Sequence, residues 1–160
     1  MAGNRSVVDL GVLWLGQGLG SGRSPLAPGT LGTVPGVGLA WLLGTTGPWA
    51  YLVGTALIIV IAVLVAGRAA VLLGCHDHPS IVIDEIAGML VAMILLPVTP
   101  LALLTGFCLF RIFDIAKPPP IGLLDRKLGG GIGIVADDVA AGIYANICLQ
   151  LIAATTGVFN

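Results

Sequence analysis

The feature that most constrains this chain is the confinement of its charge to short islands between long apolar stretches. Five of the eight acidic residues fall in three such islands, at Asp84 and Glu85, at Asp114, and at Asp137 and Asp138. A backbone that crosses lipid must satisfy its own hydrogen bonds, which favours helices. Charge beside lipid is costly and marks sites of function. The pattern therefore predicts an all-α, integral membrane helical bundle with its chemistry in the islands.

Composition agrees with a membrane protein. Hydrophobic residues make up 57% of the chain and charged residues only 9%, and the mean hydropathy is +1.06. Soluble domains carry roughly a quarter charged residues. A formal net charge of -1 provides no basic field for nucleic acid, so duplex DNA or RNA is not an expected partner. We expect residues 1–160 to form a single membrane-embedded domain.

The apolar stretches predict about four to five helices. Residues 48–67 contain no charge and match the roughly 30 Å hydrocarbon core, so they form the surest spanning helix. A shorter stretch, 34–43, precedes a turn signal between Gly44 and Pro48. The block 86–110 is interrupted between Pro97 and Pro100. Two prolines so near each other favour a break between two helices. A last helix is predicted over 139–155.

The number of crossings decides where the islands lie. If both interrupted blocks are helical hairpins, all islands share one face; if each block crosses once, the first carboxylate pair lies opposite the others. We prefer hairpins, because scattered charges are easier to explain when they satisfy one another or share a ligand. Arg5 and six further basic residues then lie on the common face, which becomes cytoplasmic by the positive-inside rule. These six are Arg23, Arg68, Arg111, Lys117, Arg126 and Lys127.

A glycine-rich segment, residues 16–33, opens the series of islands. Glycine lets backbone N–H groups turn toward an anion at close approach, and Ser21, Arg23 and Thr30 add further donors, which makes the segment a candidate phosphate site. Glycine-rich runs also serve as packing or hinge segments, and this one lacks the Gly-Lys-Ser/Thr ending of a Walker loop.

Two carboxylate pairs, Asp84 with Glu85 and Asp137 with Asp138, each precede an apolar helix. A single pair could cap a helix and gain from its dipole. Two such pairs are better explained by a divalent cation, which removes the repulsion between adjacent carboxylates. Mg²⁺ takes oxygen ligands and is typically held by one or two carboxylates together with substrate phosphate, so these four acids are the predicted metal ligands.

The island after the block 86–110 combines both signs of charge. Arg111, Asp114 and Lys117 are spaced by three, which puts them on nearly one helical face before a proline run ends the helix. They could form an ion-pair ladder. Alternatively, Arg111 offers a fork and Lys117 a point charge for a phosphate, with Asp114 orienting them or binding metal.

Four motifs in this order resemble the phosphatidylglycerophosphatase A family. They are residues 20–33 (GSGRSPLAPGTLGT), 81–89 (IVIDEIAGM), 110–121 (FRIFDIAKPPPI) and 133–142 (GIVADDVAAG). The resemblance implies a helical, magnesium-dependent phosphatase of the bacterial inner (cytoplasmic) membrane. Such an enzyme hydrolyses the terminal phosphate of phosphatidylglycerol phosphate, giving phosphatidylglycerol and inorganic phosphate in phospholipid biosynthesis.

Combined with this resemblance, the islands suggest a mechanism. Asp84, Glu85 and one or both of Asp137 and Asp138 hold Mg²⁺, while Arg111, Lys117 and the glycine-rich segment hold phosphate oxygens at the cytoplasmic face. The attacking group is either water or an aspartate that forms a covalent intermediate. A small ion-coupled membrane transporter is the alternative function, although its acids would lie near the bilayer midplane rather than at segment ends.

Overall fold

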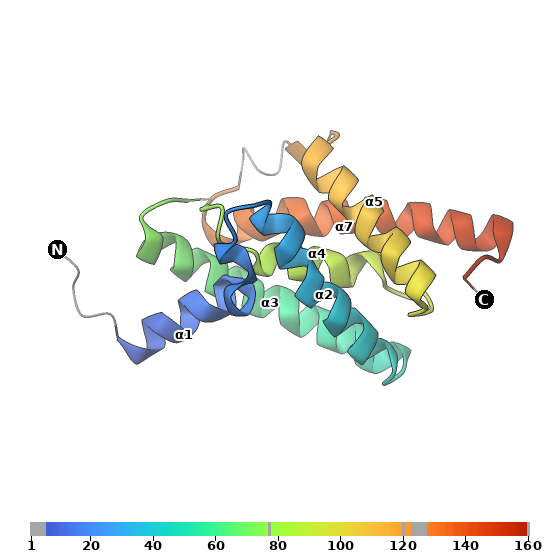
Figure 1. Ribbon diagram of the computed structural model, residues 1–160, viewed down its shortest axis with the longest axis horizontal. Coiled ribbons are helices and arrows are strands. Elements are labelled where there is room, and N and C mark those ends of the chain that lie inside the picture. The colour runs from blue at the N-terminus through green and yellow to red at the C-terminus, as the bar shows by residue number, and fades with distance from the viewer. Residues whose placement is uncertain (1–5, 77, 120, 123–127, 160) are drawn as a thin grey trace.

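The computed structural model describes residues 6–76, 78–119, 121–122 and 128–159, and within them every regular element is a helix. The all-α prediction is confirmed for this part of the chain (Figure 1). Arg5, Arg126 and Lys127, which were counted for orientation, lie outside the described residues. The elements are α1 (Val7–Gly16), the 3₁₀ helix η1 (Gly18–Arg23), α2 (Pro28–Gly44), α3 (Pro48–Leu73), α4 (Ile83–Ala92), α5 (Pro100–Ala116) and α7 (Gly130–Thr156).

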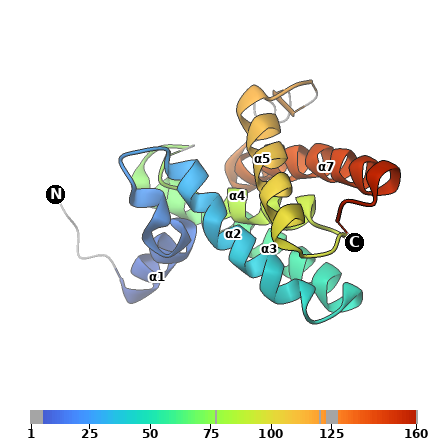
Figure 2. The same cartoon turned by 45° about the vertical axis from the view of Figure 1, so that its right-hand side comes forward.

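Both predicted breaks are helix boundaries. Helix α2 ends at Gly44 and α3 begins at Pro48, and α5 begins at Pro100 after the turn that follows α4. Proline is tolerated at these positions because the first N–H groups of a helix have no partner within it. Thr99 caps α5 by accepting a hydrogen bond from the Ala102 N–H at 3.3 Å. The chain turns back at each break, so α2 and α3, and likewise α4 and α5, meet at the same end of the molecule (Figures 1 and 2).

Two helices are long and apolar enough to cross a membrane by length and composition, α3 and α7. Helix α3 includes the predicted span 48–67. The predicted start of the last helix is wrong, because α7 begins at Gly130 and therefore contains Asp137 and Asp138 in its interior. Glycine is a weak helix former, but here it permits close packing: a Cβ on Gly131 would overlap the Val63 carbonyl oxygen of α3. Tertiary contact thus overrides local propensity.

The short helix α4 occupies the centre of the bundle. It packs against α2, α3, α5 and α7, and most of its side chains are buried. Its last carbonyl groups, where the helix stops inside the bundle, are satisfied by side chains of its neighbours. Tyr51 Oη donates to the Leu90 oxygen at 2.9 Å, and Asn146 Nδ2 donates to the oxygens of Ala92 at 3.0 Å and Ile94 at 2.8 Å. These bonds satisfy two carbonyl groups in the last turn of this ten-residue helix and one just beyond it.

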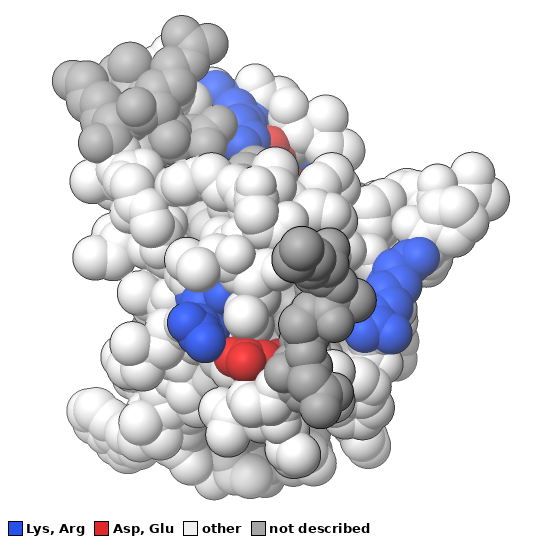
Figure 3. All heavy atoms as spheres, turned by 90° about the vertical axis from the view of Figure 1, so that its left-hand side faces the viewer, with Lys and Arg blue, Asp and Glu red and all other residues white. Residues whose placement is uncertain are grey.

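The two ends of the bundle differ in polarity. The turns after α2 and α4 lie at one end, whereas the starts of α2, α4 and α7 and the ends of α3 and α5 gather at the other (Figure 1). The molecule viewed from that second end shows Lys, Arg and acidic side chains among largely uncharged atoms (Figure 3). Elsewhere many large apolar side chains are exposed, including Leu57 and Leu64 of α3 and Ile147 of α7.

Candidate active site

A polar pocket of about 300 Å³ opens at this second end, where the sequence islands converge. Seven of the predicted site residues line it, contributed by α4, by the end of α5 and by α7. These seven are Asp84, Glu85, Arg111, Asp114, Lys117, Asp137 and Asp138. Pro28, Gly29, His76, Pro79, Ile81 and Ile134 complete the lining. Segments separated by more than 50 positions in sequence therefore build one site.

Three carboxylates in the pocket are close enough to share one cation. Asp84, Glu85 and Asp138 each offer an oxygen, and these oxygens lie within 4.8 Å of one another. Asp84 and Glu85 occupy the first turn of α4, as the sequence predicts, and Asp138 comes from α7. Asp84 and Asp138 are only 7% and 4% exposed. Carboxylates this buried and this close require compensation by positive charge.

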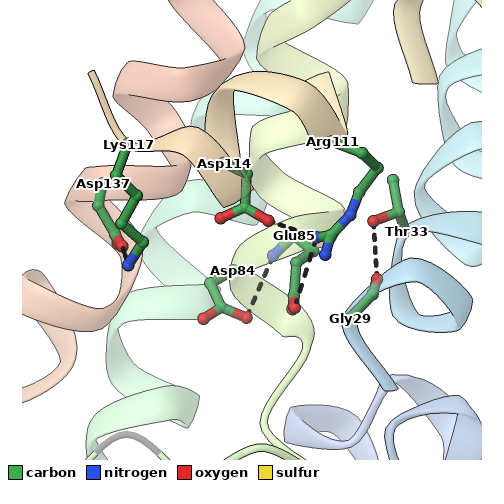
Figure 4. Close-up of polar contacts among 8 residues, drawn as sticks. All are labelled: Gly29, Thr33, Asp84, Glu85, Arg111, Asp114, Lys117 and Asp137. Carbon is green, nitrogen blue, oxygen red and sulfur yellow. Dashed lines mark hydrogen bonds and ion pairs between the residues drawn. The ribbon is translucent and has the colours of Figure 1, made fainter. Parts of the chain in front are cut away.

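The other member of the second acidic pair points to a different partner. Asp137 Oδ2 accepts a hydrogen bond from Lys117 Nζ at 2.6 Å (Figure 4). Asp137 thus pairs with Lys117, whereas its neighbour Asp138 offers an oxygen to the cluster with Asp84 and Glu85. Lys117 follows α5 in the left-handed conformation, with φ of 41°.

Arg111 lies at the centre of the pocket wall formed by α5. Its Nη1 atom is 2.5 Å from Asp114 Oδ2 and 3.9 Å from Glu85 Oε1. The contact with Asp114 is an ion pair rather than a hydrogen bond, because the geometry is off the line that an N–H donor needs. Arg111 Nε and Nη1 are buried without a hydrogen-bond partner among the described residues. A guanidinium with unused donors beside a pocket is suited to a phosphate.

Gly29, in the first turn of α2, closes the pocket on the other side of Glu85 and Arg111 (Figure 4). A Cβ at this position would overlap Glu85 Oε1 and would lie 3.1 Å from Arg111 Nη2. A side chain here would therefore displace the Glu85 carboxylate from its present position. The absence of a side chain leaves the α2 backbone in direct contact with the charged groups, at a helix N-terminus where anions are favoured.

The predicted phosphate donors of the glycine-rich segment do not line the polar pocket, unlike the seven residues above. Ser21 and Arg23 lie in η1 and Thr30 in α2, and none of the three is among the residues that line the pocket. Ser21 Oγ donates to the Gly18 oxygen at 2.8 Å, and Arg23 Nε donates to Gln17 Oε1 at 2.6 Å. Both side chains therefore form these hydrogen bonds within residues 17–23.

Gln17 connects this segment to the loop before α4. It is 6% exposed, and its Nε2 donates to Ser80 Oγ at 2.9 Å, while the Val82 N–H donates to the Gly16 oxygen at 2.9 Å. A Cβ on Gly22 would overlap the Ser80 carbonyl oxygen, so η1 and the loop before α4 are in direct contact. The glycine-rich segment thus holds the loop that presents Asp84 and Glu85.

The electrostatics of the pocket favour a bound cation. The pKa of Glu85 is raised to about 8, mainly by burial and also by the neighbouring carboxylates of Asp138 and Asp114. Together these outweigh the lowering by the hydrogen bond with Asp84 and by the charge of Arg111. Glu85 Oε2 and Asp138 Oδ2 are buried with no hydrogen-bond partner among the described residues. Buried carboxylate oxygens without donors are suited to a hard divalent ion such as Mg²⁺.

Three contributors to the site were not singled out by sequence reasoning. Gly29 was only part of the glycine-rich segment 16–33, and neither Gln17 nor His76 was assigned a role. His76 lines the pocket and its Nε2 accepts from the Gly130 N–H at 3.0 Å, at the start of α7. The Pro-Gly pair at 28–29 carried a usable signal, since proline favours a helix start and glycine permits close approach. Gln17 and His76 had no local signal.

Comparison with known proteins agrees with the motifs and the pocket. The sequence model of the phosphatidylglycerophosphatase A family matches residues 14–153. The chain is 42% identical to a phosphatidylglycerophosphatase A of Escherichia coli over 133 residues, covering 82% of this chain and 77% of that protein. The identity is also 42% to the Haemophilus influenzae protein of the same name, over 83% of each chain.

A more distant relative carries a different description. A putative phosphatidylinositol-3-phosphatase of Bacteroides thetaiotaomicron is 34% identical over 86% of this chain and 90% of its own length. No solved structure matches the chain.

Proposed function

The chain belongs to the phosphatidylglycerophosphatase A family, and we propose that its polar pocket hydrolyses the terminal phosphate of phosphatidylglycerol phosphate. The products are phosphatidylglycerol and inorganic phosphate, so the protein is a phosphoric monoester hydrolase of phospholipid biosynthesis. One observation carries this function at the level of residues. Asp84, Glu85 and Asp138 meet Arg111 and Lys117 in a single pocket, although α4, α5 and α7 supply them separately.

Asp84, Glu85 and Asp138 are the residues that would hold Mg²⁺. Their oxygens fit one ion by mutual distance, and two of these carboxylates have buried oxygens without donors among the described residues. When bound, the ion neutralises charge on the phosphate and polarises the phosphoryl group. Asp137, also predicted as a ligand, would instead act through Lys117, to which it is hydrogen bonded.

The basic side chains would hold the substrate phosphate. Arg111 offers a planar fork whose Nε is buried without a hydrogen-bond partner among the described residues, and Lys117, held by Asp137, offers a point charge in the same pocket. Both neutralise charge that develops on the phosphoryl oxygens in the transition state. Asp114 keeps the Arg111 guanidinium in position through its ion pair. Thr30, beside Gly29, would contribute the phosphate donor of the glycine-rich segment, while Ser21 and Arg23 would shape that segment.

The bundle would lie in the bacterial inner membrane with the pocket at the cytoplasmic face. Helices α3 and α7 are long enough to span, and their exposed side chains are largely apolar. The two hairpins, α2 with α3 and α4 with α5, would be embedded beside them. The capped end of α4 supports this placement, because lipid offers no donors to free carbonyls. The basic residues of the pocket end agree with a cytoplasmic orientation.

Phosphate release by the purified protein tests the function. The protein in detergent micelles is given phosphatidylglycerol phosphate with Mg²⁺ or with EDTA, and phosphatidic acid and glycerol 3-phosphate are assayed in parallel. Release that needs Mg²⁺ and prefers the first lipid is the expected result. Equal hydrolysis of all three compounds would contradict the assignment of substrate, and undiminished release in EDTA would contradict the metal.

A further inference from the structure

A second hollow, lined by apolar side chains and glycine, lies along α2 and α3. Its volume is about 460 Å³. Pro35, Leu39 and Leu42 of α2 form one wall, Ile58 and Ile61 of α3 form the other, and the first turn of α4 forms part of the lining. None of its lining residues carries a charge. We call this hollow the α2–α3 groove.

The groove and the polar pocket share the first turn of α4. Ile83 and Ile86 line the groove, whereas the two residues between them, Asp84 and Glu85, line the pocket. At about 100° per residue, the apolar hollow and the acidic cluster therefore lie on different faces of the same helical turn. A molecule that filled both would carry a phosphate at one end and hydrocarbon at the other.

Helix α2 connects the two hollows in a second way. Gly29 in its first turn faces the polar pocket, and the groove begins at Pro35, six residues further along. At 1.5 Å per residue this separation is about 9 Å along the helix axis. The groove then continues to Leu42, toward the end of the bundle remote from the charged groups.

We propose that the α2–α3 groove binds one acyl chain of the lipid whose terminal phosphate occupies the polar pocket. This inference rests on the proposed function and adds the part of the enzyme that recognises the lipid tail. A hydrocarbon chain matches the apolar lining and gains free energy by leaving water or a mixed interface. Hydrocarbon chains would also surround this groove in a membrane, because its α3 wall belongs to one of the two candidate spanning helices among the described residues.

Substitution of Gly38 can test whether the groove binds an acyl chain without disturbing the core. It lies in α2 and lines the groove, and a Cβ added there would meet nothing within 4 Å. A large side chain at this position therefore fills the groove rather than displacing a packed neighbour. Gly11 of α1 is a matched control, because a Cβ there also meets nothing within 4 Å and the residue lines neither hollow.

The kinetic test compares two forms of the substrate, phosphatidylglycerol phosphate with dioleoyl and with dihexanoyl chains, in the same detergent. Gly38→Trp should lower kcat/KM for the dioleoyl lipid by at least about tenfold, because displaced methylene groups lose their burial. Hydrolysis of the dihexanoyl lipid should change by less than about twofold. Gly11→Trp should leave both substrates unaffected. Equal loss on both lipids, or no loss on either, overturns the proposal.

A binding test on the wild-type protein does not depend on a variant or on turnover. The full chain in nanodiscs is irradiated with phosphatidylglycerol phosphate that carries a diazirine on one acyl chain, and labelled peptides are mapped. Labelling should concentrate on residues 35–42 and 58–61. Unlabelled phosphatidylglycerol phosphate should suppress it, whereas phosphatidylglycerol, which lacks the terminal phosphate, should not.

The outcomes of the binding test separate a substrate chain from bulk lipid. Labelling spread over the outer faces of α3 and α7, and insensitive to the competitor, overturns the groove assignment. Groove labelling that competes normally, in a protein that releases no phosphate from either substrate, would contradict the proposed hydrolysis while leaving the groove as a lipid site.

Discussion

Gly88 of α4 and Gly142 of α7 cross in direct backbone contact. A Cβ on Gly142 would overlap the Gly88 carbonyl oxygen, and a Cβ on Gly88 would lie 2.7 Å from the Asp138 carbonyl oxygen. Asp84 and Asp138 each precede one of these glycines by four residues, which is about one helical turn. The glycine crossing therefore sets the separation between the two carboxylates that the proposed metal site requires.

Gly142→Ala should push α7 away from α4. We expect a loss of about 1–3 kcal/mol in stability, typical of overpacking, together with weaker Mg²⁺ binding because Asp138 moves away from Asp84. Thermal unfolding and the Mg²⁺ dependence of phosphate release measure the two effects. Gly11→Ala, in open space on α1, is the control. Unchanged Mg²⁺ affinity in Gly142→Ala would show that the crossing does not position the acids.

Substitution of single acids should separate metal ligands from phosphate contacts. Asp84→Asn and Asp138→Asn should each lower kcat by at least about a hundredfold, because each removes a proposed metal ligand. Asp137→Asn should instead raise KM with little change in the Mg²⁺ dependence, since Asp137 contacts Lys117. Membrane insertion should persist in all three variants. Full activity in Asp84→Asn would exclude this residue as a ligand.

Mg²⁺ binding should release a proton from Glu85. Its pKa is raised to about 8, so without a cation the carboxyl is largely protonated at neutral pH. The cation binds the ionised form, so affinity should increase as the pH rises through the pKa and level off above it. Calorimetry in buffers of different ionisation enthalpy measures the proton. An affinity that is constant from about pH 6 to pH 9 would contradict this coupling.

Arg111→Lys should reduce kcat/KM by roughly tenfold to a hundredfold, because an ammonium cannot reproduce the fork of a guanidinium at a phosphate. Steady-state kinetics on phosphatidylglycerol phosphate provides the measurement. Arg68→Lys is the matched control: Arg68 pairs with Asp9 at 2.8 Å on an exposed surface, where solvent screens the ion pair. Similar kinetics for both variants would remove Arg111 from the substrate site.

Asn146→Leu should destabilise the buried end of α4. The amide donates to the carbonyl oxygens of Ala92 and Ile94, and Gln150 Nε2 also donates to the Ile94 oxygen at 3.2 Å. Loss of the amide therefore removes the side-chain donor of the Ala92 oxygen, at a cost of about 1–3 kcal/mol. Thermal unfolding in detergent measures the change. Thr105→Ala, which removes an exposed hydroxyl bonded within its own helix, should have a much smaller effect. Equal stability of the two variants would mean that water or detergent reaches the end of α4.

Local sequence signals located most of the helix boundaries. The prolines at 48 and 100 begin α3 and α5, and the proline run after Lys117 follows the end of α5, because proline restricts its own backbone and removes a donor. The same reasoning failed at α7. The predicted start at 139 left out the glycines at 130, 131 and 133, which belong to α7, and Gly131 makes the close approach to α3, where a Cβ would overlap the Val63 carbonyl oxygen.

The sequence by itself determined the class of fold and the residues available for chemistry, because apolar length and sparse charge are properties of the chain that need no partner. Only the tertiary structure decided how those residues are paired. It placed Asp138 beside Asp84 and Asp137 beside Lys117, and it assigned Gln17 to hold the loop before α4. These pairings depend on where helices distant in sequence cross, and that is set by contacts such as Gly88 with Gly142, which no local pattern contains.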